Sequence, residues 1–87
     1  MKSETRILGV FVKERHQNIA LIQDVLTKYG CSIRTRLGIN VSSQLNVPDS
    51  GLILLELIGD MKEMDKLEDA LKEIHQVQVK KMVFGEL

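Results

Sequence analysis

Two stretches of the chain carry apolar side chains on both sides of an extended backbone, and they limit the possible folds more than any other feature. Residues 5–13 (TRILGVFVK) and 52–58 (LILLELI) are rich in branched side chains, as strands covered on both faces are. Residues 32–41 and 77–84 instead alternate apolar and polar side chains, the period of a strand with one buried face. The sequence therefore predicts two central and two edge strands.

Two helical stretches separate these strands. In residues 16–29 the apolar side chains recur at spacings of three and four, and Gly30 follows, which predicts a helix that ends at a left-handed glycine. Asp60 and Glu63 have the spacing of an N-terminal capping box before a second helix. The apolar stripe of this second helix consists of Met64, Leu67, Leu71 and Ile74. Its opposite side is predicted to face water and carries Lys62, Asp65, Lys66, Glu68, Asp69, Lys72 and Glu73.

The order of elements is βαββαβ, and it specifies an architecture. Each strand-helix-strand half requires a right-handed crossover onto one sheet, which gives an α+β, ferredoxin-like sandwich with strand order 4-1-3-2 and both helices on one face. This order places the first and third strands at the centre, where their two-sided apolar pattern belongs. We expect residues 1–87 to form a single domain, because chains divide at about 100 to 200 residues per domain.

The sheet face without helices is a predicted oligomer interface. Leu52 and Leu54 would be exposed on it in a monomer, and a contiguous apolar patch on a small domain marks an interaction surface. A chain of this length also buries little of its surface, so we expect a homo-oligomer, a dimer or a tetramer. If Glu56 points outward with these leucines, Arg34 and Arg36 on the neighbouring strand should share its face.

Composition argues against several classes of partner. Twelve basic and twelve acidic residues give no net charge, and one Tyr, two Phe and no Trp offer few stacking platforms. We therefore expect neither direct nucleic-acid binding nor a membrane partner. The single cysteine, Cys31, cannot form an internal disulfide, and no apolar run has the length of a signal core or a membrane span. A cytoplasmic location is expected.

No residue pattern indicates catalysis. His16, Cys31 and His75 lack metal-ligand spacing, and no nucleophile elbow or phosphate-binding loop is present. We predict no enzyme activity, no cofactor and no metal site, and we expect Cys31 to be a small buried residue. Arg34 and Arg36 have two interpretations, a bidentate site for an anion or charged protection of an edge strand, and protection is the more common.

The segment from Arg6 to Phe84 resembles the ACT-like regulatory domains. The resemblance extends to the small family of iron-only hydrogenase system regulators, whose fold is similar to the C-terminal domain of the nickel-responsive repressor. It rests on residues 29–33 (YGCSI), 36–39 (RLGI), 52–57 (LILLEL) and 74–80 (IHQVQVK). The several-histidine ligand set of the nickel repressor is not reproduced.

This resemblance implies an effector site near the turn between the first strand and the first helix, at an interface between subunits. The turn, residues 13–18, lacks the glycine of amino-acid-binding ACT domains, which argues against an amino-acid effector. We predict that a small anion binds His16 and Asn18 at the helix start together with Arg34 and Arg36 of a neighbouring subunit. The predicted function is a stand-alone regulatory module that responds to this effector or acts through a protein partner. The alternatives are a ligand-free interaction adaptor and a small metal sensor.

Overall fold

The computed structural model describes residues 4–13, 15–40 and 51–85. All six predicted strands and helices are present within about two residues of their expected limits. Residues 42–51 (SSQLNVPDSG) contain the single proline of the chain and end in turn-forming residues, so the sequence predicts a loop there. They lie outside the described residues, except for Gly51, which begins a strand. The elements are β1 (Thr5–Val12), α1 (Arg15–Lys28), a 3-10 helix (Gly30–Ser32), β2 (Ile33–Asn40), β3 (Gly51–Leu57), α3 (Met61–Lys72) and β4 (Val77–Phe84).

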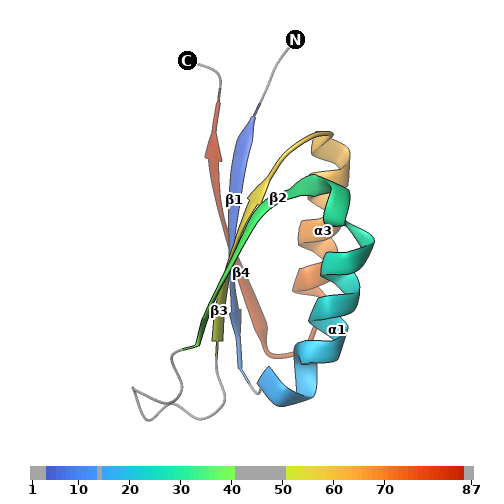
Figure 1. Ribbon diagram of the computed structural model, residues 1–87, viewed down its shortest axis with the longest axis vertical. Helices are drawn as coiled ribbons and strands as arrows, with labels where there is room; N and C mark the ends of the chain where they lie inside the picture. The colour runs from blue at the N-terminus through green and yellow to red at the C-terminus, as the bar shows by residue number, and fades with distance from the viewer. Residues whose placement is uncertain (1–3, 14, 41–50, 86–87) are drawn as a thin grey trace.

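The predicted topology is confirmed. The four strands form one sheet in the order β2-β3-β1-β4, and β1 pairs antiparallel with both β3 and β4. Figure 1 shows that α1 and α3 cover one face of this sheet and leave the other face without a helix. The fold is therefore a ferredoxin-like βαββαβ sandwich, with its core between the sheet and the two helices.

Alternate residues of the central strands build that core. Leu8 and Val10 of β1, with Leu55 and Leu57 of β3, face the helices and are at most 1% exposed. The two helices add apolar stripes at three- and four-residue spacing, as the sequence predicts. These stripes comprise Ile22 and Leu26 of α1 and Met64, Leu67 and Leu71 of α3.

The start of α3 and the end of α1 are stabilised by different hydrogen bonds. Asp60 caps α3, because its carboxylate accepts a hydrogen bond of 2.9 Å from the Lys62 amide. The predicted partner in a capping box, Glu63, instead pairs with Lys66 at 3.0 Å. The prediction of a left-handed stop at Gly30 is wrong: among the described glycines only Gly59 has a positive φ, of 91°. At the end of α1 the chain instead tightens into the 3-10 helix, in which the Ser32 amide donates to the Tyr29 carbonyl.

A bulge near the start of β2 changes which residues face the helices. Ile33 pairs with Leu57, but Thr35 pairs with Glu56, so β2 has one additional residue at this point. A shift of one residue moves each following side chain to the other side of a sheet. The sequence pattern predicted that alternate positions of β2, such as Thr35 and Leu37, would be buried. Because of the bulge, these positions lie on the helix-free side of the sheet.

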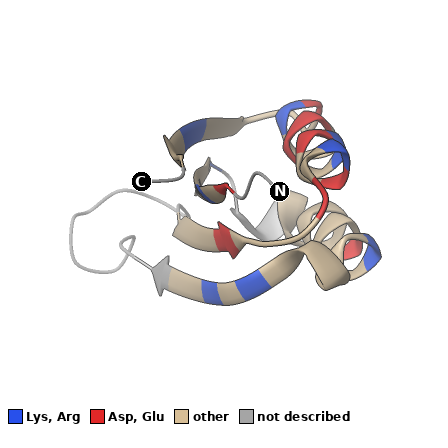
Figure 2. Ribbon diagram, turned by 90° about the horizontal axis from the view of Figure 1, so that it is seen from above, with Lys and Arg blue, Asp and Glu red and all other residues tan. Residues whose placement is uncertain are grey.

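The bulge makes one sequence-based prediction wrong. Glu56 does point away from the helices, but its neighbour on that face is Thr35, whose hydroxyl donates to the Glu56 carboxylate at 2.8 Å. Arg36 pairs with Leu55 and so lies at a position on the helix side, while Arg34 falls within the bulge. Both arginines are exposed, and Figure 2 shows the basic positions along β2. The two arginines and Glu56 therefore do not form one outward charge cluster.

Candidate functional site

The helix-free side of the sheet, called here the open face, is a candidate interaction surface. Leu52 and Leu54 alternate with the buried residues of β3 and lie on this side, half-buried. Across the strands, Leu37 is 53% exposed, Met82 55% and Phe84 53%. Among the residues whose side chains are described, the apolar residues of the open face are Ile7, Phe11, Leu37, Leu52, Leu54, Met82 and Phe84. The predicted outward positions of Leu52 and Leu54 are thus confirmed, and their part in an oligomer interface stays a prediction.

The centre of the open face is flat. Gly9 pairs with Leu54 on one side and with Lys80 on the other, and it has no side chain of its own. A Cβ atom at Gly9 would have the Leu54 Cδ2 atom 3.8 Å away and the Lys80 carbonyl oxygen 4.0 Å away, which are ordinary contacts. The backbone of β1 is therefore accessible at this point, between Leu54 and the neighbouring edge strand.

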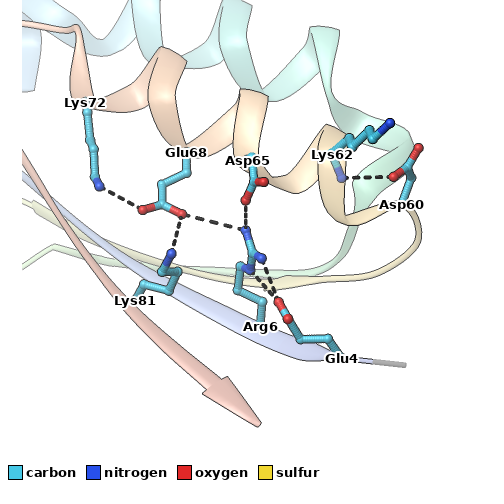
Figure 3. A network of polar contacts seen from close by, with 8 residues as sticks. All are labelled: Glu4, Arg6, Asp60, Lys62, Asp65, Glu68, Lys72 and Lys81. Atoms are coloured by element: carbon cyan, nitrogen blue, oxygen red, sulfur yellow. Dashed lines mark hydrogen bonds and ion pairs between the residues drawn. The ribbon is translucent and has the colours of Figure 1, made fainter. Parts of the chain in front are cut away.

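A cluster of charged side chains joins β1, α3 and β4 on the opposite side of the sheet (Figure 3). The Arg6 guanidinium lies 2.7 Å from the Glu4 carboxylate and 2.6 Å from that of Asp65. Glu68 lies 2.8 Å from the Lys72 ammonium and 3.3 Å from that of Lys81. Arg6 and Glu68, each 5% exposed, are separated by 3.7 Å and connect the two halves. The prediction that Glu68 faces water is wrong.

Burial and ion pairing act in opposite directions on this cluster. Burial by itself would raise the pKa of Glu68, but hydrogen bonds from Lys72 and Lys81 outweigh it and lower that pKa below its usual value. The hydrogen bond from Arg6 lowers the pKa of Asp65. Burial would lower the pKa of Arg6, and the bonds to Asp65 and Glu4 raise it instead. These shifts favour the charged forms of Arg6, Asp65 and Glu68, and the mutual pairing of the cluster fits a structural role.

Asn18 has a structural role that the sequence did not indicate. Its side chain is 8% exposed, and its amide nitrogen donates to the His75 carbonyl at 2.9 Å and to the Lys13 carbonyl at 3.3 Å. Asn18 thereby ties the turn before α1 to the turn before β4. His16 belongs to the first turn of α1, and its side chain lies outside the described residues.

The predicted anion site is not assembled within one chain. No hydrogen bond or ion pair in the described part of the structure joins Asn18 to Arg34 or Arg36. The prediction placed the two arginines in a neighbouring subunit, so a single chain does not test it. The Asn18 side-chain nitrogen already donates hydrogen bonds to two backbone carbonyls. Asn18 therefore has fewer hydrogen-bond donors left for a ligand than the sequence suggested.

A small pocket lies where β1 ends and β4 begins. It has a volume of about 200 Å³ and is lined by Phe11, Lys13, Gln76, Val77 and Gln78. The Lys13 amide donates to the Gln76 carbonyl at 2.9 Å, and Gln76 has a positive φ of 66°. Sequence reasoning missed this pocket because its two halves are far apart along the chain and meet only through the pairing of β1 with β4.

The remaining candidates for chemistry are isolated. Cys31 is exposed in the 3-10 helix, so the expectation of a buried cysteine is wrong. Within residues 4–13, 15–40 and 51–85, no group of three or more His, Cys, Asp or Glu side chains could hold a metal ion. No helix of the described chain is long and apolar enough to cross a membrane.

Comparison with known proteins supports the fold. No protein-family model matches the chain, and no curated protein matches it in sequence. Among solved structures, the uncharacterized protein TM1266 from Thermotoga maritima is 24% identical over 97% of this chain and 99% of its own, with a TM-score of 0.82.

Two further solved structures are similar over almost the whole chain. The ACT domain of GTP pyrophosphokinase from Chlorobium tepidum is 15% identical, with coverage of 94% of this chain and 100% of that domain and a TM-score of 0.68. CPII, a nitrogen regulatory PII-like protein from Thiomonas intermedia K12 bound to ADP, AMP and bicarbonate, is 12% identical. It covers 99% of this chain and 98% of its own, with a TM-score of 0.64. At these identities the similarities establish the ferredoxin-like fold that ACT and PII-like proteins share.

Proposed function

We propose that the chain is a regulatory module that assembles with copies of itself through the open face and responds to a small ligand. The observation that carries the proposal is the apolar surface on the helix-free side of an otherwise well-packed sheet. A patch of this kind on a small domain is a common feature of interaction surfaces. The similarity in fold to an ACT domain and to PII-like regulatory proteins supports the same class of function.

The size of the open face is compatible with a weak or moderate dimer. Four strands at a spacing of about 4.8 Å and up to eight residues at about 3.4 Å per residue cover roughly 500 Å². Two such faces in contact bury roughly 1,000 Å² in projection, and side-chain relief increases this value. Stable interfaces begin at about 1,200 Å² in total, so this surface alone lies near that limit.

The test compares two leucine substitutions. Leu54→Lys places a charge on the open face, whereas Leu21→Lys changes an exposed leucine of α1, which lies on the helix side of the sheet. Light scattering at tens of micromolar, roughly the concentration for a modest symmetric interface, should show a dimer or tetramer for the parent chain and a monomer for Leu54→Lys. Leu21→Lys should assemble like the parent. A monomeric parent, or equal assembly of both variants, would contradict the proposal.

The proposed effector is a small anion, and CPII, whose structure contains ADP, AMP and bicarbonate, gives a precedent in the same fold. Arg34 and Arg36 are the exposed basic residues of β2 that we propose for its recognition across a subunit boundary, together with His16 and Asn18. A ligand at 100 times its dissociation constant stabilises the folded state by about 2.7 kcal/mol, which a melting-temperature screen of metabolites detects. Replacing both arginines by glutamine should abolish that stabilisation.

A ligand-free adaptor is the second candidate, because the same apolar face suits a different protein as well as a second copy. No response to any metabolite, together with a monomeric parent, would favour the adaptor. A small metal sensor is a third candidate, tested by the metal content of the purified protein and of Cys31→Ala. The proposal gives the chain no enzymatic role. The iron-only hydrogenase system remains a proposed context that rests on the sequence resemblance alone.

A further inference from the structure

We propose that the pocket between the end of β1 and the start of β4 binds a small organic carboxylate with a planar apolar body. This inference deepens the proposed function, because it gives the regulatory module a ligand site within a single chain and names the class of ligand. It differs from the predicted anion site, which requires two arginines of a neighbouring subunit.

Two cross-strand pairs, separated by the pair of Val12 with Val77, form the pocket. Phe11 of β1 pairs with Gln78 of β4, and both lie on the open face, because the adjacent residues Val12 and Val77 contact the core. One step beyond the strand ends, the Lys13 amide donates to the Gln76 carbonyl at 2.9 Å, which extends the ladder by a further pair. The pocket is therefore a continuation of the sheet, and its lining residues belong to β1, β4 and the residues that adjoin their ends.

The lining residues supply complementary chemistry. The Lys13 side chain carries a compact positive charge that pairs with a carboxylate. The amides of Gln76 and Gln78 can each donate and accept hydrogen bonds, so they can bind the edges of the same ligand. Phe11, half-buried, offers an apolar ring surface. Together these groups favour a ligand that is charged at one end and flat and apolar at the other.

The volume limits the size of that ligand. About 200 Å³ is the space of roughly seven water molecules at about 30 Å³ each. A six-membered ring with one carboxylate is comparable in size to this open pocket, whereas a complete nucleotide would extend beyond its lining residues. Benzoate is therefore a suitable probe, and benzamide is a neutral molecule of nearly the same shape.

The turn beside the pocket is held in an unfavourable backbone conformation. Gln76 has a φ of 66°, in the left-handed region that side chains other than glycine and asparagine rarely adopt. Such conformations persist where surrounding contacts enforce them, and they are concentrated at ligand sites. Here the Lys13 amide binds the Gln76 carbonyl, and the buried Asn18 side chain binds the His75 carbonyl. These bonds fix the turn before any ligand arrives, so Asn18 is a positioning residue for the pocket.

The pocket also borders the proposed interface between copies. Phe11 belongs both to the pocket and to the apolar part of the open face. A ligand whose apolar body packs against the Phe11 ring would thus lie at the margin of a face-to-face assembly. Ligand binding and assembly are then coupled through a shared side chain, as a regulatory module requires.

The experiment is a titration of the isotope-labelled full chain with benzoate, followed by the amide signals in NMR spectra. We expect the main-chain signals of Lys13, Gln76 and Gln78, and the side-chain amides of both glutamines, to shift with a dissociation constant on the order of 1 mM for a nine-atom ligand. Lys13→Gln should weaken binding at least tenfold. The matched control, Lys62→Gln at an exposed position of α3, should leave it unchanged.

Several results would overturn the inference. If benzamide binds as tightly as benzoate, the charge of the ligand is not recognised. If inorganic phosphate causes the same shifts as benzoate, the apolar body of the ligand is not recognised. Shifts confined to Arg34 and Arg36 would place the ligand at the other site. The inference and the proposed assembly can be refuted separately. If the parent chain is an oligomer that Leu54→Lys dissociates, and benzoate does not bind, only the pocket proposal is refuted. If the chain is a monomer and binds benzoate at Lys13, the pocket proposal holds and the assembly proposal is refuted.

Discussion

The buried charge cluster permits a quantitative prediction for Arg6→Met. Methionine keeps most of the apolar stem of Arg6 but removes the guanidinium that contacts Glu4, Asp65 and Glu68. Three carboxylates then remain close together with only Lys72 and Lys81 to balance them. We expect the variant to fold at neutral pH and to be less stable than the parent.

The expected loss follows from how exposed each partner is. A hydrogen bond to a charged partner contributes about 1.5 to 3 kcal/mol, and the bond to Glu4, whose side chain is 18% exposed, falls near the lower end. The Asp65 side chain is 61% exposed, so water screens its contribution. Glu68 still pairs with Lys72 and Lys81 in the variant, so its charge stays compensated. We expect a total loss of about 2 kcal/mol, which corresponds to roughly 8 to 16 °C in the melting temperature of a domain of this size.

The loss should depend on pH in a defined direction. The pKa values of Asp65 and Glu68 are lowered in the folded chain, by Arg6 for Asp65 and by the two lysines, against burial, for Glu68. A lowered folded-state pKa gives stabilisation that is complete above the unfolded pKa, near about 4, and is lost as pH falls through the folded pKa. Arg6→Met removes the cause of the shift at Asp65. The difference between parent and variant should therefore shrink between about pH 5 and pH 3.

Urea denaturation followed by circular dichroism, at one protein concentration and at pH 7 and pH 3, measures both quantities. Lys66→Met is the matched control, because Lys66 pairs with Glu63 at 3.0 Å on the exposed side of α3. Its midpoint should equal that of the parent. A loss for Arg6→Met that is no larger than the control, or that is the same at both pH values, would refute the reasoning.

Three further substitutions test the local structure, each read by the same denaturation assay. Asp60→Ala removes the side-chain cap of α3 and should cost about 1 kcal/mol, with Asp69→Ala within α3 as the control. Leu71→Ala opens a cavity in the core and should cost about 2 to 5 kcal/mol, whereas Leu21→Ala, at an exposed position, should stay within about 0.5 kcal/mol of the parent. Gly59→Ala forces a Cβ atom into a backbone with φ 91° and should cost about 1 to 2 kcal/mol. Values near zero for Asp60, Leu71 or Gly59 would contradict the corresponding contact.

The topology was predictable because its signals are local and repeated. Residues 5–13 and 52–58 lack the alternation of the edge strands, and that contrast alone distinguishes the centre of the sheet from its edges. The position of the helices follows in the same way from stripes such as Leu67 and Leu71, whose spacing matches one helical face.

The details that the sequence did not reveal depend on pairing between distant segments. The bulge at Ile33–Thr35 contains no glycine, and it is defined only by the pairing of β2 with β3. Glu68 is buried because β1 and β4 bring Arg6 and Lys81 against it, which the charge pattern of α3 alone does not indicate. A signal was present: Lys81 interrupts the helix-facing apolar positions of β4, and Arg6 occupies the first helix-facing position of β1, ahead of its apolar residues. The small pocket had no comparable signal.

The central place of β1 has a consequence for folding during synthesis. Thr5 pairs with Phe84, and Val12 pairs with both Gly51 and Val77, so each partner of the first strand is made long after it. Sheets built from such distant pairings fold slowly. At about 5 to 20 residues per second, a ribosome leaves β1 without β4 for several seconds. A chain that stops before Val77 keeps β1 as an edge strand with apolar residues on both faces, the kind that joins other chains and aggregates.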